Sequence, residues 1–303
     1  MYYSHFGLKG LPFGITPDTE FYFASKSYQE AFNTLVVALD AGEGFIKITG
    51  EVGTGKTLLC RKLMKSLGKK YKVAYIPNPY LEPLSFLWML ATELGISVSM
   101  IANQNKMLAA LNDGLMKLMR ENVQVVVCLD EAQSMPIETL EALRLLSNLE
   151  TEKRKLVQVV IFGQPELDEK LDHPSIRQLR QRIGFEYELG RLSREELGLY
   201  LYHRLHIAGY HGGTIFSPAS IQLLYKKSGG TPRLVNILAH KALMVAYGRG
   251  IQEVSVDEMR LAIEDTKAVS TIHSDVKKTN KSVTAMFKFW LKDLMGSFVR
   301  VRG

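Results

Sequence analysis

The chain of 303 residues is long enough for one large and one small domain, and its 46% hydrophobic and 23% charged residues are typical of a soluble globular protein. Two cysteines, Cys60 and Cys128, exclude a disulfide framework and a cysteine metal site, and no run of eighteen uncharged apolar residues predicts a membrane-spanning helix. The formal charge of +7 is concentrated in residues 277–303, which contain seven lysines and arginines and one aspartate. This distribution favours a localised electrostatic contact over a nucleic-acid-binding surface that extends along the whole protein.

Residues 1–44 are predicted to form an ordered, irregular arm and then a helix. The arm is dense in aromatic and turn residues, and the helix over residues 25–42 places Leu35 on its apolar face and ends at Gly42. Two interpretations of the arm remain open. Its aromatic residues could help to wall an adenine near the loop that follows, or they could complete the core.

Residues 46–59 read as an apolar strand, a glycine-rich loop and the start of a helix, and the loop matches G-x-x-x-x-G-K-[ST] from Gly50 to Thr57. Glycines permit turns that point consecutive N–H groups into one concavity, and the helix dipole adds to it, so the loop is predicted to cradle nucleotide phosphates. Lys56 would reach the β- and γ-phosphates of ATP, and the Thr57 hydroxyl would coordinate Mg²⁺. An ordinary glycine turn is the alternative, which needs four motif positions to coincide by accident. The predicted phosphate-binding residues are Gly50, Glu51, Val52, Gly53, Thr54, Gly55, Lys56, Thr57 and Leu58.

A further strand, residues 124–129, is a β-branched run that is typical of a strand buried on both faces of a parallel sheet. It ends in Asp130 and Glu131, at the edge where such sheets bind their ligands. Two adjacent carboxylates repel each other unless a cation is present. Asp130 is therefore predicted to hold Mg²⁺, and Glu131 to orient and polarise the attacking water. A solvated strand end is the alternative.

The next buried strand ends at Gln164. This amide could sense the γ-phosphate or fix the water, or it could only cap the following helix, where Pro165 occupies the first turn. Further on, Arg177, Arg180 and Arg182 lie within six residues. At least one of them is predicted to act as a finger on the nucleotide of a neighbouring subunit, and the alternative is a solvated helix face.

From Ser193 onward the pattern is all-helical, and Ser193 with Glu196 forms a predicted capping box. Arg233 follows Gly229 and Gly230 at the start of a helix. A cation is unfavourable at the positive end of a helix unless an anion compensates it, and either a bound γ-phosphate or a nearby carboxylate would serve.

The last residues differ from the rest in charge. Residues 268–284 are polar and linker-like, and residues 285–302 predict a short amphipathic helix with Trp290 on its apolar face and Lys288 and Lys292 opposite. This helix could lie in an anionic membrane interface or dock on a membrane partner, or it could pack on its own domain or on a second subunit. The predicted organisation is an arm and helix (1–44), an α/β nucleotide-binding domain (45–192), a helical lid (193–267) and a basic tail (268–303).

Taken together, these features resemble an AAA+ ATPase, and more narrowly the ExeA/GspA and MshM group associated with type II secretion and mannose-sensitive type IV pilus assembly. The resemblance covers about residues 1–265 and is carried by YYSHFGLKGLPFGITPD, GEVGTGKT, LDEAQ, FGQPEL, RQLRQRI and GGTPRLVNILA. It implies an α/β P-loop fold with a parallel sheet flanked by helices, followed by a small helical lid that moves as the nucleotide changes. It also implies that Gln164 is a first sensor, Arg233 a second sensor, and Arg177 or Arg182 the finger.

The expected function is Mg²⁺-dependent ATP hydrolysis that supports pilus or secretion-system assembly, with inner-membrane components as partners, self-association, and a cytoplasmic location with peripheral membrane contact. ExeA-like members continue through a membrane helix into a peptidoglycan-binding domain, so the short basic tail favours the MshM-like branch. Two rival hypotheses are a nucleic-acid-associated ATPase, as in transposition helpers and origin-binding proteins, and a nucleotide-stabilised scaffold with little turnover.

Overall fold

The structure is a computed structural model that describes residues 2–98, 103–146, 149 and 155–266. These residues form two compact units, one of residues 14–207 with 231–233, and one of residues 2–13, 208–230 and 234–266. The basic tail predicted over residues 268–303 lies outside the described residues. The domain boundaries predicted from the sequence stay a prediction.

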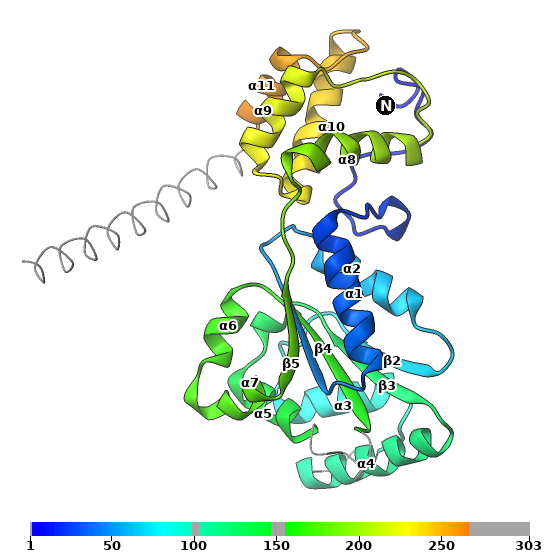
Figure 1. Cartoon of the computed structure of the whole chain (residues 1–303), viewed down its shortest axis with the longest axis vertical. Helices are drawn as coiled ribbons and strands as arrows, with labels where there is room; N and C mark the ends of the chain where they lie inside the picture. The colour runs from blue at the N-terminus through cyan, green and yellow to red at the C-terminus, as the bar shows by residue number, and fades with distance from the viewer. Residues whose placement is uncertain (1, 99–102, 147–148, 150–154, 267–303) are drawn as a thin grey trace, which may run out of the picture. The chain divides into compact units, whose positions relative to one another are not determined.

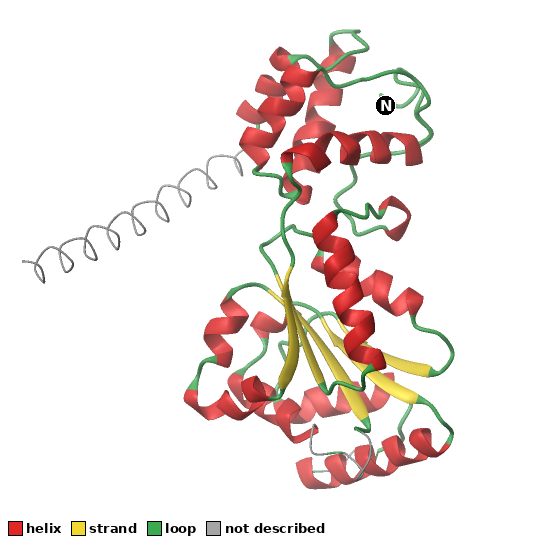
Figure 2. Cartoon of the chain, in the orientation of Figure 1, coloured by secondary structure: helices red, strands yellow, loops and turns green. Residues whose placement is uncertain are grey.

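The larger unit is built on a parallel sheet, drawn in yellow in Figure 2. The sheet has five strands in the order β2-β3-β4-β1-β5. The strands are β1 (Phe45–Thr49), β2 (Tyr71–Ile76), β3 (Gln124–Leu129), β4 (Val157–Gly163) and β5 (Ile183–Glu188). β1 and β4 are buried along their whole length, whereas β5 alternates between half-buried and exposed residues because it forms an edge. The predicted α/β fold with a parallel sheet is confirmed, and the carboxyl ends of β3, β4 and β1 are neighbours.

Helices cover both faces of this sheet because alternate residues of each strand point to opposite sides. α1 (Lys26–Asp40) and α2 (Lys56–Ser66) share one face, where they pack on residues such as Ile48, Cys128 and Phe162 (Figure 1). The opposite face, with Val127 and Ile161, is covered by α3 (Pro83–Glu93), α4 (Gln104–Arg120), α5 (Ile137–Leu146), α6 (Glu166–Leu171) and α7 (Arg177–Gln181). Short 3-10 turns are η1 (Thr19–Phe21), η2 (Ala132–Ser134) and η3 (Pro174–Ile176), and α8 (Arg194–Ile207) also belongs to this unit.

Lys47 interrupts the apolar pattern of β1 with a buried charge. Its side chain is 6% exposed, and its Nζ forms ion pairs with Asp168 of α6 and, at 2.7 Å, with Glu186 of β5. Burial lowers the pKa of Lys47, but the hydrogen bonds to the two carboxylates outweigh it, so the net pKa is raised. The cation therefore stays charged inside the sheet.

The smaller unit is helical and contains α9 (Pro218–Ser228), α11 (Val256–Glu264) and most of α10 (Pro232–Gly248). The first part of the arm packs into its core: Tyr2 lies 5.5 Å from the His240 ring, and Phe13 lies edge-on to Phe216 at 5.9 Å. Tyr2 and Phe13 are both buried. For residues 2–13 the structure thus favours core packing among the two interpretations of the arm.

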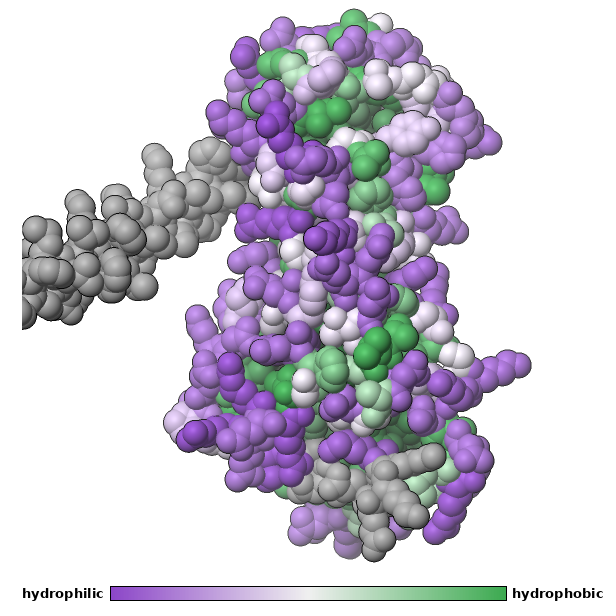
Figure 3. All heavy atoms as spheres, in the orientation of Figure 1, coloured by the Kyte–Doolittle hydropathy of each residue, from purple (hydrophilic) through white to green (hydrophobic). Residues whose placement is uncertain are grey.

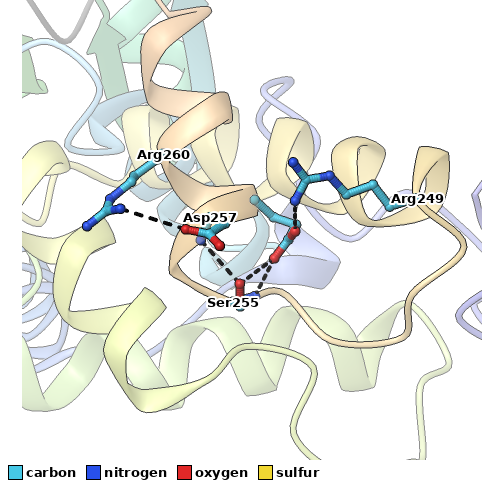
Figure 4. A network of polar contacts seen from close by, with 5 residues as sticks. Arg249, Ser255, Asp257 and Arg260 are labelled. Atoms are coloured by element: carbon cyan, nitrogen blue, oxygen red, sulfur yellow. Dashed lines mark hydrogen bonds and ion pairs between the residues drawn. The ribbon is translucent and has the colours of Figure 1, made fainter.

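A polar network closes the turn between α10 and α11 (Figure 4). Ser255 caps α11 and donates hydrogen bonds from its N–H and its hydroxyl to Glu258 Oε2, at 3.0 and 2.6 Å. Arg249, at the end of α10, forms an ion pair with Oε1 of the same carboxylate, and Arg260 pairs with Asp257 at 3.7 Å. Glu258 is 2% exposed, and the donors from Ser255 and Arg249 offset the cost of burying its charge.

On the face drawn in Figure 3, the hydrophobic groups of the described residues are scattered among hydrophilic ones. Within the described ranges, every helix is too short or too polar to cross a bilayer.

Candidate functional site

The glycine-rich loop connects β1 to α2 and begins at the carboxyl end of the sheet. Gly53 and Gly55 have φ angles of 82° and 103°, in the left-handed region that favours glycine. Lys56 is 5% exposed, and its Nζ donates to the carbonyl oxygens of Gly50 at 2.7 Å and Glu51 at 3.1 Å. Burial lowers the pKa of Lys56, although the carboxylates of the site oppose this shift. The loop thus holds a cation at its centre that lacks a bulk-water shell.

Tyr28 of α1 contacts this loop at Gly55. Its hydroxyl donates to the carbonyl oxygen of Gly55, and a Cβ added at Gly55 would lie 2.0 Å from that hydroxyl. Tyr28 was not predicted as a site residue. Its position three residues before Ala31, on the apolar face of the same helix, could have indicated that Tyr28 is buried.

Thr57 and Asp130 bring the loop and the end of β3 together. Thr57 Oγ1 donates to Asp130 Oδ2 at 2.6 Å, and the Glu131 N–H donates to Asp130 Oδ1 at 3.0 Å. Asp130 is 2% exposed, and burial raises its pKa despite the hydrogen bond from Thr57. A hydroxyl and a desolvated carboxylate in contact fit Mg²⁺, because a hard cation prefers oxygen ligands and would offset the burial of the charge.

Glu131 lies next to Asp130 with a φ of 54°, which is uncommon for a residue other than glycine. Its Oε2 accepts hydrogen bonds from Gln164 Nε2 at 3.1 Å and from Gln133 Nε2 at 2.5 Å. The structure therefore brings the predicted water-orienting carboxylate and the predicted sensor amide together. Gln133 was missed as a site residue, although it stands two positions after Glu131.

Arg233 also lies at the loop. Its N–H donates to the Gly53 carbonyl oxygen at 3.1 Å, and a Cβ on Gly53 would lie 2.6 Å from the Arg233 Cβ. The side chain is exposed, and among the described residues its guanidinium has no hydrogen-bond or ion-pair partner. A carboxylate was one of the two anions predicted to compensate this arginine, and none forms an ion pair with it within the described part of the chain.

The arginines around α7 are not part of this cluster. α7 directly precedes β5, so it lies at the amino-terminal edge of the sheet, opposite the glycine-rich loop. Arg180 pairs with Asp172 at 2.8 Å, and Arg182 Nη1 donates to the Arg144 carbonyl at 3.4 Å. Arg177 is exposed and forms no ion pair within the described ranges. Any role of Arg177 or Arg182 in phosphate chemistry would be in a neighbouring subunit.

The chain is similar to several known proteins. Residues 39–171 match the AAA domain family. General secretion pathway protein A from Aeromonas hydrophila is 38% identical over 269 residues, which cover 89% of this chain and 49% of that protein. The solved structure of Cdc6p from Pyrobaculum aerophilum has a TM-score of 0.63 at 20% identity, over 81% of this chain and 70% of that one. The ORC2 protein of Aeropyrum pernix has a TM-score of 0.59 at 21% identity, over 82% and 72%.

The parallel sheet, the glycine-rich loop and the carboxylates at the end of β3 define a P-loop NTPase of the AAA+ class. Within that class the chain is similar to general secretion pathway protein A. The chain spans about half the length of that relative. The likeness of the two solved structures to this chain is one of fold only.

Proposed function

We propose that this chain is a Mg²⁺-dependent ATPase that supports the assembly of a type II secretion apparatus or an MSHA-type type IV pilus. The observation that carries the enzymatic part is the 2.6 Å hydrogen bond from Thr57 to Asp130, because it joins the phosphate loop and the acidic strand end in one site next to Glu131. The assembly part is supported by the 38% identity to general secretion pathway protein A.

Each residue of the site would have a distinct role. The loop amides from Gly50 to Leu58 would bind the phosphates, and Lys56 would exchange its two carbonyl partners for phosphate oxygens. Thr57 and Asp130 would hold Mg²⁺, which would neutralise negative charge on the phosphates. Glu131 would orient the attacking water and accept its proton.

The remaining roles concern the γ-phosphate and its release. Gln164 reaches Glu131 directly, so an amide that senses the γ-phosphate would also report to the water-activating carboxylate. Arg233 adds an exposed cation beside Gly53, where it could bind the same phosphate. Arg177 or Arg182 would complete the site of a neighbouring subunit, which requires self-association.

The partners we propose are inner-membrane components of the assembly apparatus, with the protein on the cytoplasmic side as a peripheral factor. A nucleic-acid-associated ATPase is not favoured, because the likeness to origin-recognition proteins is one of fold alone.

The enzymatic proposal is tested by substituting Glu131→Gln, with Glu138→Gln as the matched control on an exposed residue of α5. We expect Glu131→Gln to keep its ATP affinity and to lose about 10²- to 10⁴-fold in kcat, and Glu138→Gln to behave as the wild type. Lys56→Ala should lose ATP binding in calorimetry. Equal turnover of wild type and Glu131→Gln would remove Glu131 from this role.

The assembly part needs its own experiment. Glu131→Gln protein loaded with ATP and Mg²⁺ is incubated with solubilised inner membranes and recovered with its bound proteins. We expect secretion or pilus components to be enriched over the Lys56→Ala protein, which is not loaded. Equal recovery with both variants would contradict a nucleotide-dependent role in assembly.

A further inference from the structure

The carboxylate of Glu131 is held at one of its two oxygens by two side-chain amides. Gln133 and Gln164 both donate to Oε2, at 2.5 and 3.1 Å. Gln133 Oε1 in turn accepts the backbone N–H of Gln164 at 3.1 Å. The three residues form a closed ring of hydrogen bonds, and Gln133 contacts both of the others.

The backbone of Glu131 is held as firmly as its side chain. Its carbonyl oxygen accepts the N–H of Ser134 at 2.9 Å and the Ser134 hydroxyl at 2.8 Å, and its own N–H donates to Asp130. These contacts fix a left-handed backbone conformation that a residue other than glycine rarely adopts. Such a conformation persists only where surrounding contacts determine it, as they do here.

We infer that Gln133 is a positioning residue for ATP hydrolysis, which rests on the function proposed above. By occupying Oε2 it leaves Oε1, which accepts no hydrogen bond from the described residues, as the oxygen that takes the proton of the attacking water. Hydrolysis is faster when the carboxylate is already held in one orientation, because the reacting atoms need no rearrangement. Through its bond to Gln164, Gln133 also keeps the sensor amide and the carboxylate at a fixed spacing.

The opposite role would be a restraint that keeps Glu131 away from water. The geometry favours positioning, since the two amide donors share Oε2, so Oε1 keeps its full capacity to accept. The two roles predict opposite effects on kcat. Removal of a positioning residue slows turnover, whereas removal of a restraint accelerates it.

The test uses two variants of nearly unchanged size. Gln133→Met keeps the volume and removes every hydrogen bond, and Gln133→Glu keeps the acceptor for Gln164 but replaces the donor with a like charge beside Glu131. Gln124→Ala, on an exposed residue at the other end of β3, is the control. ATP turnover is measured against ATP concentration for the full chain, and the unfolding midpoint of each variant is recorded.

We expect kcat to fall about tenfold or more for Gln133→Met and further for Gln133→Glu, with the KM for ATP within about twofold of wild type. Gln124→Ala should match the wild type in both. A structural role would instead lower the unfolding midpoint and change KM and kcat together. Unchanged or increased kcat in both variants, while Glu131→Gln is inactive, would overturn the inference and leave the proposed function standing. A wild type without ATP turnover would refute the proposed function, and the inference with it.

Discussion

The hydroxyl of Tyr28 offers a direct test of how the first helix supports the phosphate loop. Substituting Tyr28→Phe removes the donor to the Gly55 carbonyl and keeps the ring, which is 6% exposed. Burial raises the pKa of Tyr28 well above 10, so in the wild type this hydroxyl stays a neutral donor at any pH used for the assay.

The expected magnitude follows from what the substitution leaves behind. The Gly55 carbonyl oxygen still accepts the N–H of Leu59 at 3.0 Å, so no buried acceptor becomes unsatisfied. The loss is the net value of one hydrogen bond, about 1 kcal/mol of unfolding free energy. Because Gly55 has a φ of 103° inside the phosphate loop, a loosened loop must be ordered by the nucleotide, which raises the Kd for ATP up to about fivefold.

The assay combines urea unfolding without nucleotide, calorimetry with ATP and Mg²⁺, and turnover at saturating ATP. Tyr22→Phe is the matched control, because its ring packs edge-on against Tyr28 at 5.5 Å while its hydroxyl has no hydrogen bond to any residue in the described ranges. We expect kcat to stay unchanged in both variants. If Tyr28→Phe and Tyr22→Phe bind ATP with the same affinity as the wild type, the Tyr28 hydroxyl does not shape the loop.

Three further predictions concern two titrating groups, Asp130 and Glu258. Burial raises the pKa of Asp130 above 3.8, so its carboxylate takes up a proton at a higher pH than an exposed aspartate does. Mg²⁺-dependent ATP binding should therefore begin to weaken at a correspondingly higher pH on acidification. Calorimetry between about pH 7 and pH 5 measures this. The raised pKa also means that the ionised carboxylate opposes folding, so Asp130→Asn should raise the unfolding midpoint at neutral pH without Mg²⁺. The same substitution should abolish the dependence of ATP binding on Mg²⁺. A lowered unfolding midpoint would contradict this reasoning. Burial raises the pKa of Glu258, but the bonds from Ser255 and Arg249 outweigh it and the net pKa is lowered, so its stabilisation is present above about pH 4.5 and is lost as pH falls through the lowered pKa. Glu258→Gln should lose about 1–3 kcal/mol of unfolding free energy at pH 7 and less near pH 3.5, and a pH-independent difference would contradict the network.

Much of the site could be predicted because parallel sheets gather strand ends. The motif from Gly50 to Thr57 follows one strand, and Asp130 and Gln164 each follow another. The carboxyl ends of such strands share one edge, so the sequence predicted the cluster before the strand order was known. The order β3-β4-β1 then explains why Gln164 reaches Glu131 directly.

Other parts depend on contacts that no local pattern specifies. Tyr28 reads as one more apolar residue of an amphipathic helix, and its hydroxyl has a partner 27 positions later. Gln133 reads as a polar residue in a turn, and its role appears only when β4 brings Gln164 beside it. The aromatic residues of the arm left two interpretations open, a wall for the adenine or part of the core. The partner of Tyr2 is His240, 238 positions away, which no local pattern indicates.

Lys47 shows why a buried charge is not predicted from the local sequence pattern. A single lysine in an apolar strand is normally predicted to be exposed, since burial of an unpaired ammonium group costs too much free energy. The fold meets this cost with carboxylates 121 and 139 positions away, on α6 and β5. Lys47 precedes the phosphate loop by three residues, and Asp168 follows Gln164 by four. The ion pair with Asp168 therefore joins β1, whose carboxyl end begins the glycine-rich loop, to α6, which follows Gln164.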